Sequence, residues 1–125
     1  MANYQMEARV DISKNRLYTK TTGFISDDAA VIVVDKIIAE ASKLKSGFDV
    51  ITDMREMKPA SAKAMQEFVR AATFFKKAGL NRSIQVTGED VIAAGQISRL
   101  DKESGVNALR TAKSVEDAEK ILDGK

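Results

Sequence analysis

The sequence predicts one α/β domain with a mixed, mostly parallel sheet of about five strands and about four helices. Three features lead to this prediction. Two alternating runs near the N-terminus indicate a β-hairpin, and apolar segments of strand length then alternate with segments of helical period. No linker of proline, glycine or serine divides the 125 residues. We therefore expect a single domain over residues 1–125, with the element order β-β-α-β-α-β-α-β-α.

The N-terminal run from Tyr4 to Ile12 alternates strictly between apolar and polar residues, which is the period of a strand with one solvent-exposed face. Turn-forming residues follow at 13–15, and a second alternating run extends from Arg16 to Thr22. The two runs are expected to pair as an antiparallel hairpin, with Gly23 at the end of the second strand.

The first helix is expected to begin at Ser26. Two aspartates follow this serine, which favours a helix start because the hydroxyl caps free amides and the carboxylates face the positive end of the helix dipole. Apolar residues then recur at helical spacing as far as Leu44, and Gly47 supplies a stop signal. The expected core face consists of Ala30, Val34, Ile37, Ala41 and Leu44.

Residues 48–53 form a short apolar run, as in a central strand that is covered on both faces. Asp53 is expected near the C-terminal end of this strand, and residues 54–60 are expected to form a loop. Ser61 then caps a second helix, which Gly79 ends. The expected core face of that helix consists of Met65, Phe68, Ala72 and Phe75.

Four further elements complete the order. Residues 82–87 predict a fourth strand, residues 89–103 a third helix, and residues 107–111 a fifth strand. The segment from Ser114 to Asp117 has the spacing of a capping box and begins a final helix, which ends before Gly124.

The composition excludes several kinds of chemistry. The chain has no cysteine and no histidine, so it lacks thiolates and the commonest general base and metal ligand. Its 20 basic and 18 acidic residues are spread along the chain, which does not indicate a nucleic-acid interface. No apolar run approaches the ~20 residues of a membrane helix, and the N-terminus lacks a signal pattern. We expect a cytoplasmic protein without a cofactor or metal.

Three segments of the chain carry a resemblance to a known family. They run from Leu17 to Asp27, from Leu44 to Asp53 and from Ser114 to Glu119. They resemble the SpoIIAA-like or STAS-like proteins, relatives of the anti-sigma factor antagonists. The resemblance extends over nearly the whole chain and agrees with the expected element order. It implies a SpoIIAA-like fold and a non-enzymatic, regulatory domain that binds another protein.

The resemblance also suggests a phosphorylation site. The anti-sigma factor antagonists carry a phosphorylatable serine at the start of the helix after the third strand, where their partner docks. Ser61 lies near that helix start, but Ala62 and Lys63 stand where the switch serine would fall. Ser61 is therefore a candidate phosphorylation site, and its alternative role is that of a helix cap.

The candidate binding residues follow the third strand, because ligands of open α/β sheets usually bind at the carboxyl ends of the strands. They are Asp53, Arg55, Lys58, Ser61 and Lys63, and we expect them to contact an unidentified protein partner. Phe74 is a further candidate. Adjacent residues of a helix point about 100° apart, so if Phe75 points inward, Phe74 points toward the edge of the buried stripe. There Phe74 would anchor a homodimer or another protein, or simply widen the core face.

Two other functions stay open. Lys58, Ser61 and Lys63 would also suit a small anionic or apolar ligand in a pocket at the strand ends. A hydrolase or transferase built on Asp53 and Glu56 is a third hypothesis, but the chain offers no nucleophile with a base beside it. The structural interpretation is preferred: Asp53 caps the following loop through its backbone amides, and Arg55 is close enough in sequence to pair with Asp53 or Glu56. The expected function is therefore binding, with no catalytic residue.

Overall fold

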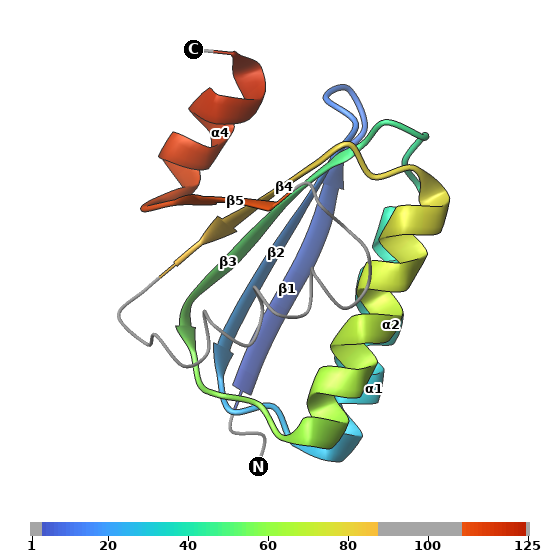
Figure 1. Cartoon of the computed structure of the whole chain (residues 1–125), viewed down its shortest axis with the longest axis vertical. Coiled ribbons are helices and arrows are strands. Elements are labelled where there is room, and N and C mark those ends of the chain that lie inside the picture. Colours follow the sequence, from blue (N-terminus) through green and yellow to red (C-terminus); the bar gives the residue numbers. More distant parts are fainter. Residues whose placement is uncertain (1–3, 88–108, 125) are drawn as a thin grey trace.

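The chain folds into a five-stranded sheet with helices on both faces (Figure 1). The computed structural model describes residues 4–87 and 109–124, which include three helices. The strands lie in the order β1-β2-β3-β4-β5 across the sheet. They are β1 (Tyr4–Asp11), β2 (Arg16–Gly23), β3 (Asp49–Met57), β4 (Arg82–Val86) and β5 (Leu109–Ala112), and the helices are α1 (Asp27–Ala41), α2 (Ala62–Ala78) and α4 (Val115–Asp123). Among the described strands, only β1 and β2 pair antiparallel, which confirms the predicted mixed, mostly parallel α/β sheet.

The hairpin of β1 and β2 forms as its alternating pattern predicts. On β1, the side chains of Gln5, Glu7 and Arg9 are exposed, whereas the intervening apolar side chains are half-buried against the core. Asn15 closes the turn with a φ of 53°, a left-handed conformation that asparagine tolerates better than most residues. Its side chain also bonds the backbone of Lys45, so the turn is tied to the end of the first helical segment.

Helix α1 begins as predicted but ends earlier. The Ser26 hydroxyl accepts a hydrogen bond from the backbone N–H of Ala29 at 3.2 Å and caps the helix. The last helical residue is Ala41, not Leu44. The Ser42 hydroxyl donates to the carbonyl of Ile38, and the amides of residues 43 and 44 bond carbonyls three residues back, in place of the four of an α-helix. Leu44 still packs against the core, which explains why the apolar period continues past the helix.

Strand β3 is longer than predicted, and this corrects the position of Asp53. The strand runs from Asp49 to Met57, so Asp53 is its middle residue and the expected loop at 54–60 shrinks to Lys58–Ser61. Buried Met54 and Met57 hold the extra residues against the core. An irregularity in the pairing of β2 with β3 allows this extension beyond the part of β3 that β4 covers.

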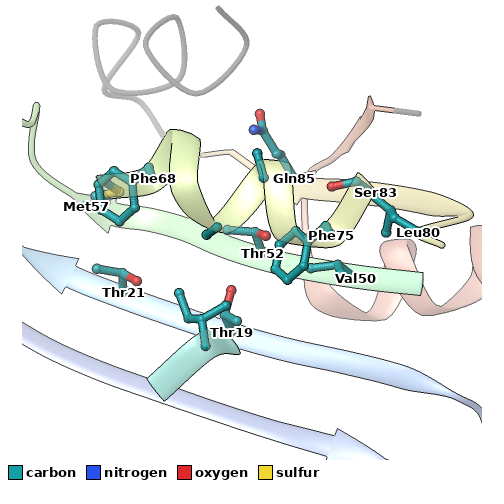
Figure 2. Close-up of a pocket in the computed structure, with 13 residues that line it drawn as sticks. Thr19, Thr21, Val50, Thr52, Met57, Phe68, Phe75, Leu80, Ser83 and Gln85 are labelled. Carbon is teal, nitrogen blue, oxygen red and sulfur yellow. The ribbon is translucent and has the colours of Figure 1, made fainter. Parts of the chain in front are cut away.

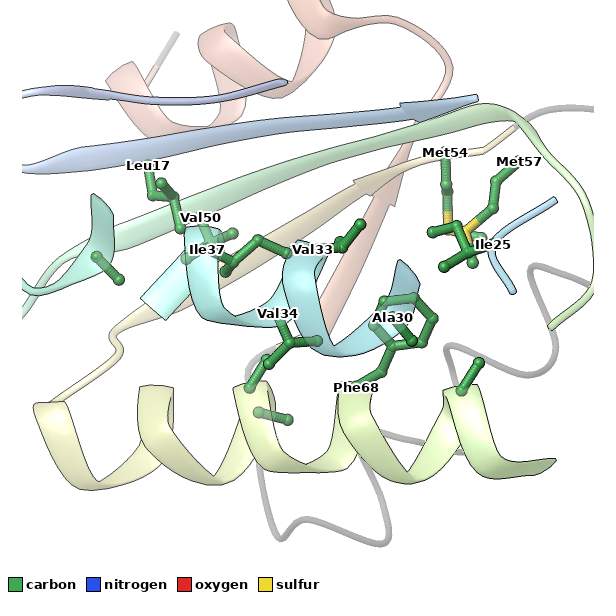
Figure 3. Close-up of a cluster of buried hydrophobic side chains, with 14 of the residues drawn as sticks. Leu17, Ile25, Ala30, Val33, Val34, Ile37, Val50, Met54, Met57 and Phe68 are labelled. Carbon is green, nitrogen blue, oxygen red and sulfur yellow. The ribbon is translucent and has the colours of Figure 1, made fainter. Parts of the chain in front are cut away.

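Helices α1 and α2 pack together on one face of the sheet, and α4 lies on the other (Figures 1 and 3). Ser61 caps α2 and Gly79 ends it with a φ of 97°, both as predicted. A side chain at Gly79 would also collide with Ser46. Of the predicted core face of α2, Phe68 and Ala72 are buried, while Met65 and Phe75 are half-buried against the cluster. The cluster between these helices and the sheet includes Leu17, Val33, Val34, Val50, Met54 and Phe68.

Helix α4 covers the opposite face of β3, β4 and β5. Ser114 caps it and Gly124 ends it, as predicted, and its buried side chains Ala118 and Leu122 pack against apolar residues of the sheet. Arg16 of β2, which is only 4% exposed, pairs with Glu119 and Asp123 at 3.0 Å each. This charged cluster ties the last helix to the first hairpin.

Two predicted elements lie wholly or partly outside the described residues. The expected helix at 89–103 lies outside them, so the number of helices stays a prediction. The expected strand at 107–111 corresponds to β5, of which the described part is Leu109–Ala112. Within residues 4–87 and 109–124, no helix has the length and apolar character needed to cross a membrane.

Candidate functional site

A row of polar side chains crosses the face of the sheet that α1 and α2 cover. Thr19 of β2 lies directly opposite Thr52 of β3, and Thr52 lies directly opposite Gln85 of β4. Thr19 is 6% exposed and Gln85 is 2% exposed. A parallel sheet covered by helices normally carries valine, isoleucine or leucine at such positions. This row therefore departs from what packing alone would favour.

The row forms the floor of a pocket of about 80 Å³ between the sheet and α2 (Figure 2). Its walls are apolar and come mainly from α2, and its polar groups come from the strands. The apolar lining residues are Ile37, Val50, Met57, Phe68, Ala71, Ala72, Phe75 and Leu80. The polar lining residues are Thr19, Thr21, Thr52, Ser83 and Gln85. The pocket thus combines apolar walls with a few convergent hydrogen-bonding groups, as small-molecule sites generally do.

Gln85 has an unfilled hydrogen-bonding requirement. Its Oε1 atom is buried and accepts no hydrogen bond from any residue in the described ranges. Turning the amide over would place Nε2 in the same position and leave a donor unpaired instead. A buried polar group without a partner costs about 1–3 kcal/mol. Gln85 is therefore a group that an additional hydrogen-bonding molecule would stabilise.

The lining of the pocket limits the chemistry of such a molecule. None of the described residues that line it is charged, so a charged ligand would lose its hydration without a counter-ion. The hydroxyls and the amide can both donate and accept hydrogen bonds. The volume is roughly half that of a 150 Å³ cavity that holds benzene. The pocket therefore fits a small neutral molecule, or one end of a larger molecule, with a hydroxyl or carbonyl group.

Asp53 and Arg55 form an ion pair on the other face of the sheet. Two nitrogens of the Arg55 guanidinium lie 2.9 and 3.0 Å from the carboxylate oxygens of Asp53, which is 5% exposed. Burial raises the pKa of Asp53, but the hydrogen bonds and positive charge of Arg55 outweigh this effect and hold the pKa below its ordinary value. The pairing that the sequence suggested for these two residues is present.

Asp53 and Glu56 line two neighbouring depressions. Asp53 lines one on the α4 face with Arg9, Tyr18 and Val115, whereas Glu56 lines another nearer the end of β2, and both depressions include Lys20. Among residues 4–87 and 109–124, no three acidic side chains gather closely enough to hold a metal ion. The carboxylate of Asp53 is instead held in the ion pair with Arg55.

Ser61 makes two hydrogen bonds at the start of α2. Its hydroxyl accepts from the backbone N–H of Ala64 at 3.1 Å and donates to the carboxylate of Asp27 at the start of α1. The predicted capping role is therefore present, and the Asp27 charge opposes a phosphate at this position. Lys58 and Lys63 are exposed on either side of Ser61, and neither lysine ammonium group forms an ion pair or hydrogen bond with another described side chain.

Phe74 lies far from Ser61, near the other end of α2. It is half-buried, packs against the core, and meets Phe75 edge to face with ring centroids 6.4 Å apart. The predicted partial exposure of Phe74 is present. The six candidate residues thus occupy three separate places: the α4 face of the sheet, the start of α2, and the end of α2.

Comparison of the chain with models of known protein families and with curated protein sequences finds no match. The pocket under α2 was missed at the sequence level, although Thr19, Thr21 and Thr52 are visible as polar residues within expected strands. Their signal is weak because threonine is itself a common strand residue. Only the pairing of the strands reveals that the three threonines and Gln85 face one space.

Proposed function

We propose that this domain is a non-enzymatic binding module for a small neutral molecule, held in the pocket between α2 and the sheet. The observation that carries the proposal is the unpartnered, buried side chain of Gln85 at the end of the row that begins with Thr19 and Thr52. A ligand hydroxyl or carbonyl would bond this row, and its apolar part would contact Phe68 and Phe75 of α2.

The proposal is tested by capture of small molecules. Purified wild-type protein is incubated with a cell extract, separated by gel filtration, and its bound compounds are identified by mass spectrometry. Gln85→Met serves as the matched blank, because methionine keeps the length of glutamine and removes its hydrogen-bonding groups. A neutral compound enriched on the wild type alone would support the proposal. Equal recovery from both proteins, or none from either, would contradict it.

A second candidate is the regulatory, protein-binding role that the resemblance to SpoIIAA-like or STAS-like proteins implies. One observation favours it: Phe24 is 45% exposed beside the start of α1, and its neighbour Gly23 accepts a hydrogen bond from the Lys58 amide. An exposed aromatic ring near exposed Lys58 would suit a docking surface that includes the loop before α2.

This second candidate predicts a stoichiometric protein partner in native mass spectrometry of an affinity pull-down. Phe24→Ser and Ser61→Asp should abolish the complex, whereas Phe74→Ala should leave it intact because Phe74 lies at the other end of α2. Loss on Phe74→Ala alone would move the interface to that end. A pull-down without a stoichiometric partner would leave only the small-molecule function.

A further inference from the structure

Strand β1 forms a long, regular edge of the sheet. It has eight residues and pairs with β2 through eight consecutive residue pairs without a bulge. It is the terminal strand in the sheet order, so among the described residues its other side pairs with no strand. It contains no proline or lysine, two devices that commonly protect such an edge. This edge can accept another strand.

The sequence of β1 is complementary to itself in one antiparallel register. When two copies of the strand pair about a two-fold axis at Ala8, Glu7 of each copy lies opposite Arg9 of the other. On the same face Gln5 lies opposite Asp11, and on the core face Met6 lies opposite Val10. Two opposite-charge pairs and two apolar pairs therefore form at once.

The neighbouring registers are unfavourable. A two-fold axis at Glu7 would place Glu7 opposite its own copy, and an axis at Arg9 would place two arginines opposite each other. Registers centred between two residues would set the exposed face of one strand beside the apolar face of the other, because side chains alternate with a period of two. An axis at Val10 would pair Arg9 with Asp11 but would keep only residues 9–11 of each strand in register, so charge and length of pairing together favour the register centred on Ala8.

The oppositely charged side chains that this register pairs, Glu7 and Arg9, are exposed at the edge. The guanidinium of Arg9 lies 4.0 Å from the centre of the Tyr18 ring on β2, and it would turn from this ring toward the edge to pair with Glu7 of the second copy. Ile12 begins the turn after the strand and is 61% exposed, and it would lie near half-buried Tyr4 of the second copy if the pairing continued by one residue. Pairing would cover this isolated apolar side chain.

We infer that β1 is a self-association edge, through which two copies of the chain form a continuous ten-stranded sheet around a two-fold axis at Ala8. The occupant of the edge is a second copy of this chain. This interface is separate from Phe74, the homodimer contact that the sequence suggests, and does not depend on what the pocket under α2 binds.

The test exchanges the two charges of β1 and measures the dimer dissociation constant by sedimentation velocity over a wide range of concentrations. Arg9→Glu places like charges opposite each other twice and should weaken the dimer by about tenfold or more. The double variant Glu7→Arg with Arg9→Glu restores opposite pairs and should recover the wild-type constant. Arg70→Glu, on the exposed surface of α2, is the matched control and should have no effect.

Three results would overturn the inference. They are a wild type that stays monomeric at the highest concentration, a dimer that Arg9→Glu does not weaken, and a double variant that remains as weak as Arg9→Glu. Thermal unfolding of each variant confirms that the monomer is folded, so that loss of the dimer is not loss of the fold.

Discussion

Thr52 of β3 lies directly opposite Gln85 of β4, and both side chains face the pocket between the sheet and α2 (Figure 2). Two neighbouring polar residues at the centre of a helix-covered parallel sheet are costly for stability. Sites of this kind are expected where a binding function has a different requirement from the fold.

Replacing Gln85 with methionine should stabilise the protein. The buried Oε1 has no partner among the described residues, so removing it should raise the free energy of unfolding by about 1–2 kcal/mol. Urea denaturation of the wild type and the variant, both without ligand, measures the change. Gln66→Met, at an exposed position of α2, is the control and should change little. A less stable Gln85→Met protein would mean that the Gln85 amide already has a hydrogen-bond partner in the protein. A ligand would then not be needed to supply that partner.

Filling the pocket from the helix should have a similar effect. Ala71 is 5% exposed and lines the pocket, so Ala71→Leu should bury additional carbon atoms in space that is now empty. We expect a rise of about 1–2 kcal/mol in the free energy of unfolding, with loss of ligand binding. Ala39→Leu on the exposed face of α1 is the control. Destabilisation by Ala71→Leu would indicate that the space is too small for a ligand.

The ion pair of Asp53 and Arg55 predicts a specific dependence on pH. Because the folded-state pKa of Asp53 lies below its ordinary value of 3.8, its contribution to stability is present above that value and is lost as the pH falls through the folded-state pKa. In Arg55→Gln, burial is the main remaining influence, so the pKa of Asp53 should rise above the ordinary value. The variant should lose about 1–3 kcal/mol at neutral pH.

This prediction is measured by carboxyl carbon NMR titration of Asp53, together with urea denaturation at neutral and mildly acidic pH. The deficit of Arg55→Gln relative to the wild type should shrink as the pH falls. Arg70→Gln breaks an exposed pair with Asp35 and Glu67 and should cost at most about 1 kcal/mol at either pH. An unchanged Asp53 pKa in Arg55→Gln would show that the pair is not what sets it.

The contact between Ser61 and Asp27 predicts how a negative charge at the start of α2 behaves. Aspartate is a good cap, so Ser61→Asp alone would be tolerated, but its carboxylate would lie beside Asp27. We expect a loss of about 0.5–1 kcal/mol in Ser61→Asp, recovered in the double variant with Asp27→Asn. A double-mutant cycle by thermal unfolding measures this coupling. Additive effects would show that the two side chains do not interact.

Helix starts were well predicted from the sequence because their signals are local. Ser26, Ser61 and Ser114 each cap the helix that the sequence assigns to them, and a side-chain oxygen three residues before an amide is sufficient for this. The end of β3 was not predicted, since Met54 and Met57 continue the strand through contacts with helices that are distant in sequence. The sequence places the end of α1 too late for a related reason. Leu44 continues the apolar period of the helix, but it packs on the core from a turn after the helix has ended.

The pocket could not have been predicted from one sequence. Thr19, Thr52 and Gln85 are separated by more than thirty residues at each step, and their alignment depends on the register of parallel strands. No local pattern sets that register, whereas the hairpin register of β1 and β2 follows from a short turn. The expected site at the strand ends followed a general rule for α/β sheets and remains a prediction for the second candidate function.

The most direct test of the central claim is an NMR titration of wild-type protein with 1-butanol and with butylammonium, which share a chain length and differ in charge. We expect 1-butanol to shift the backbone amide signals of Thr19, Thr52 and Gln85 in a saturable way, and butylammonium to leave them unchanged. The same titration of Thr52→Val, which loses only the hydroxyl, should show weaker binding. Equal shifts with both compounds, or none with 1-butanol, would contradict a neutral, hydrogen-bonding pocket between α2 and the sheet.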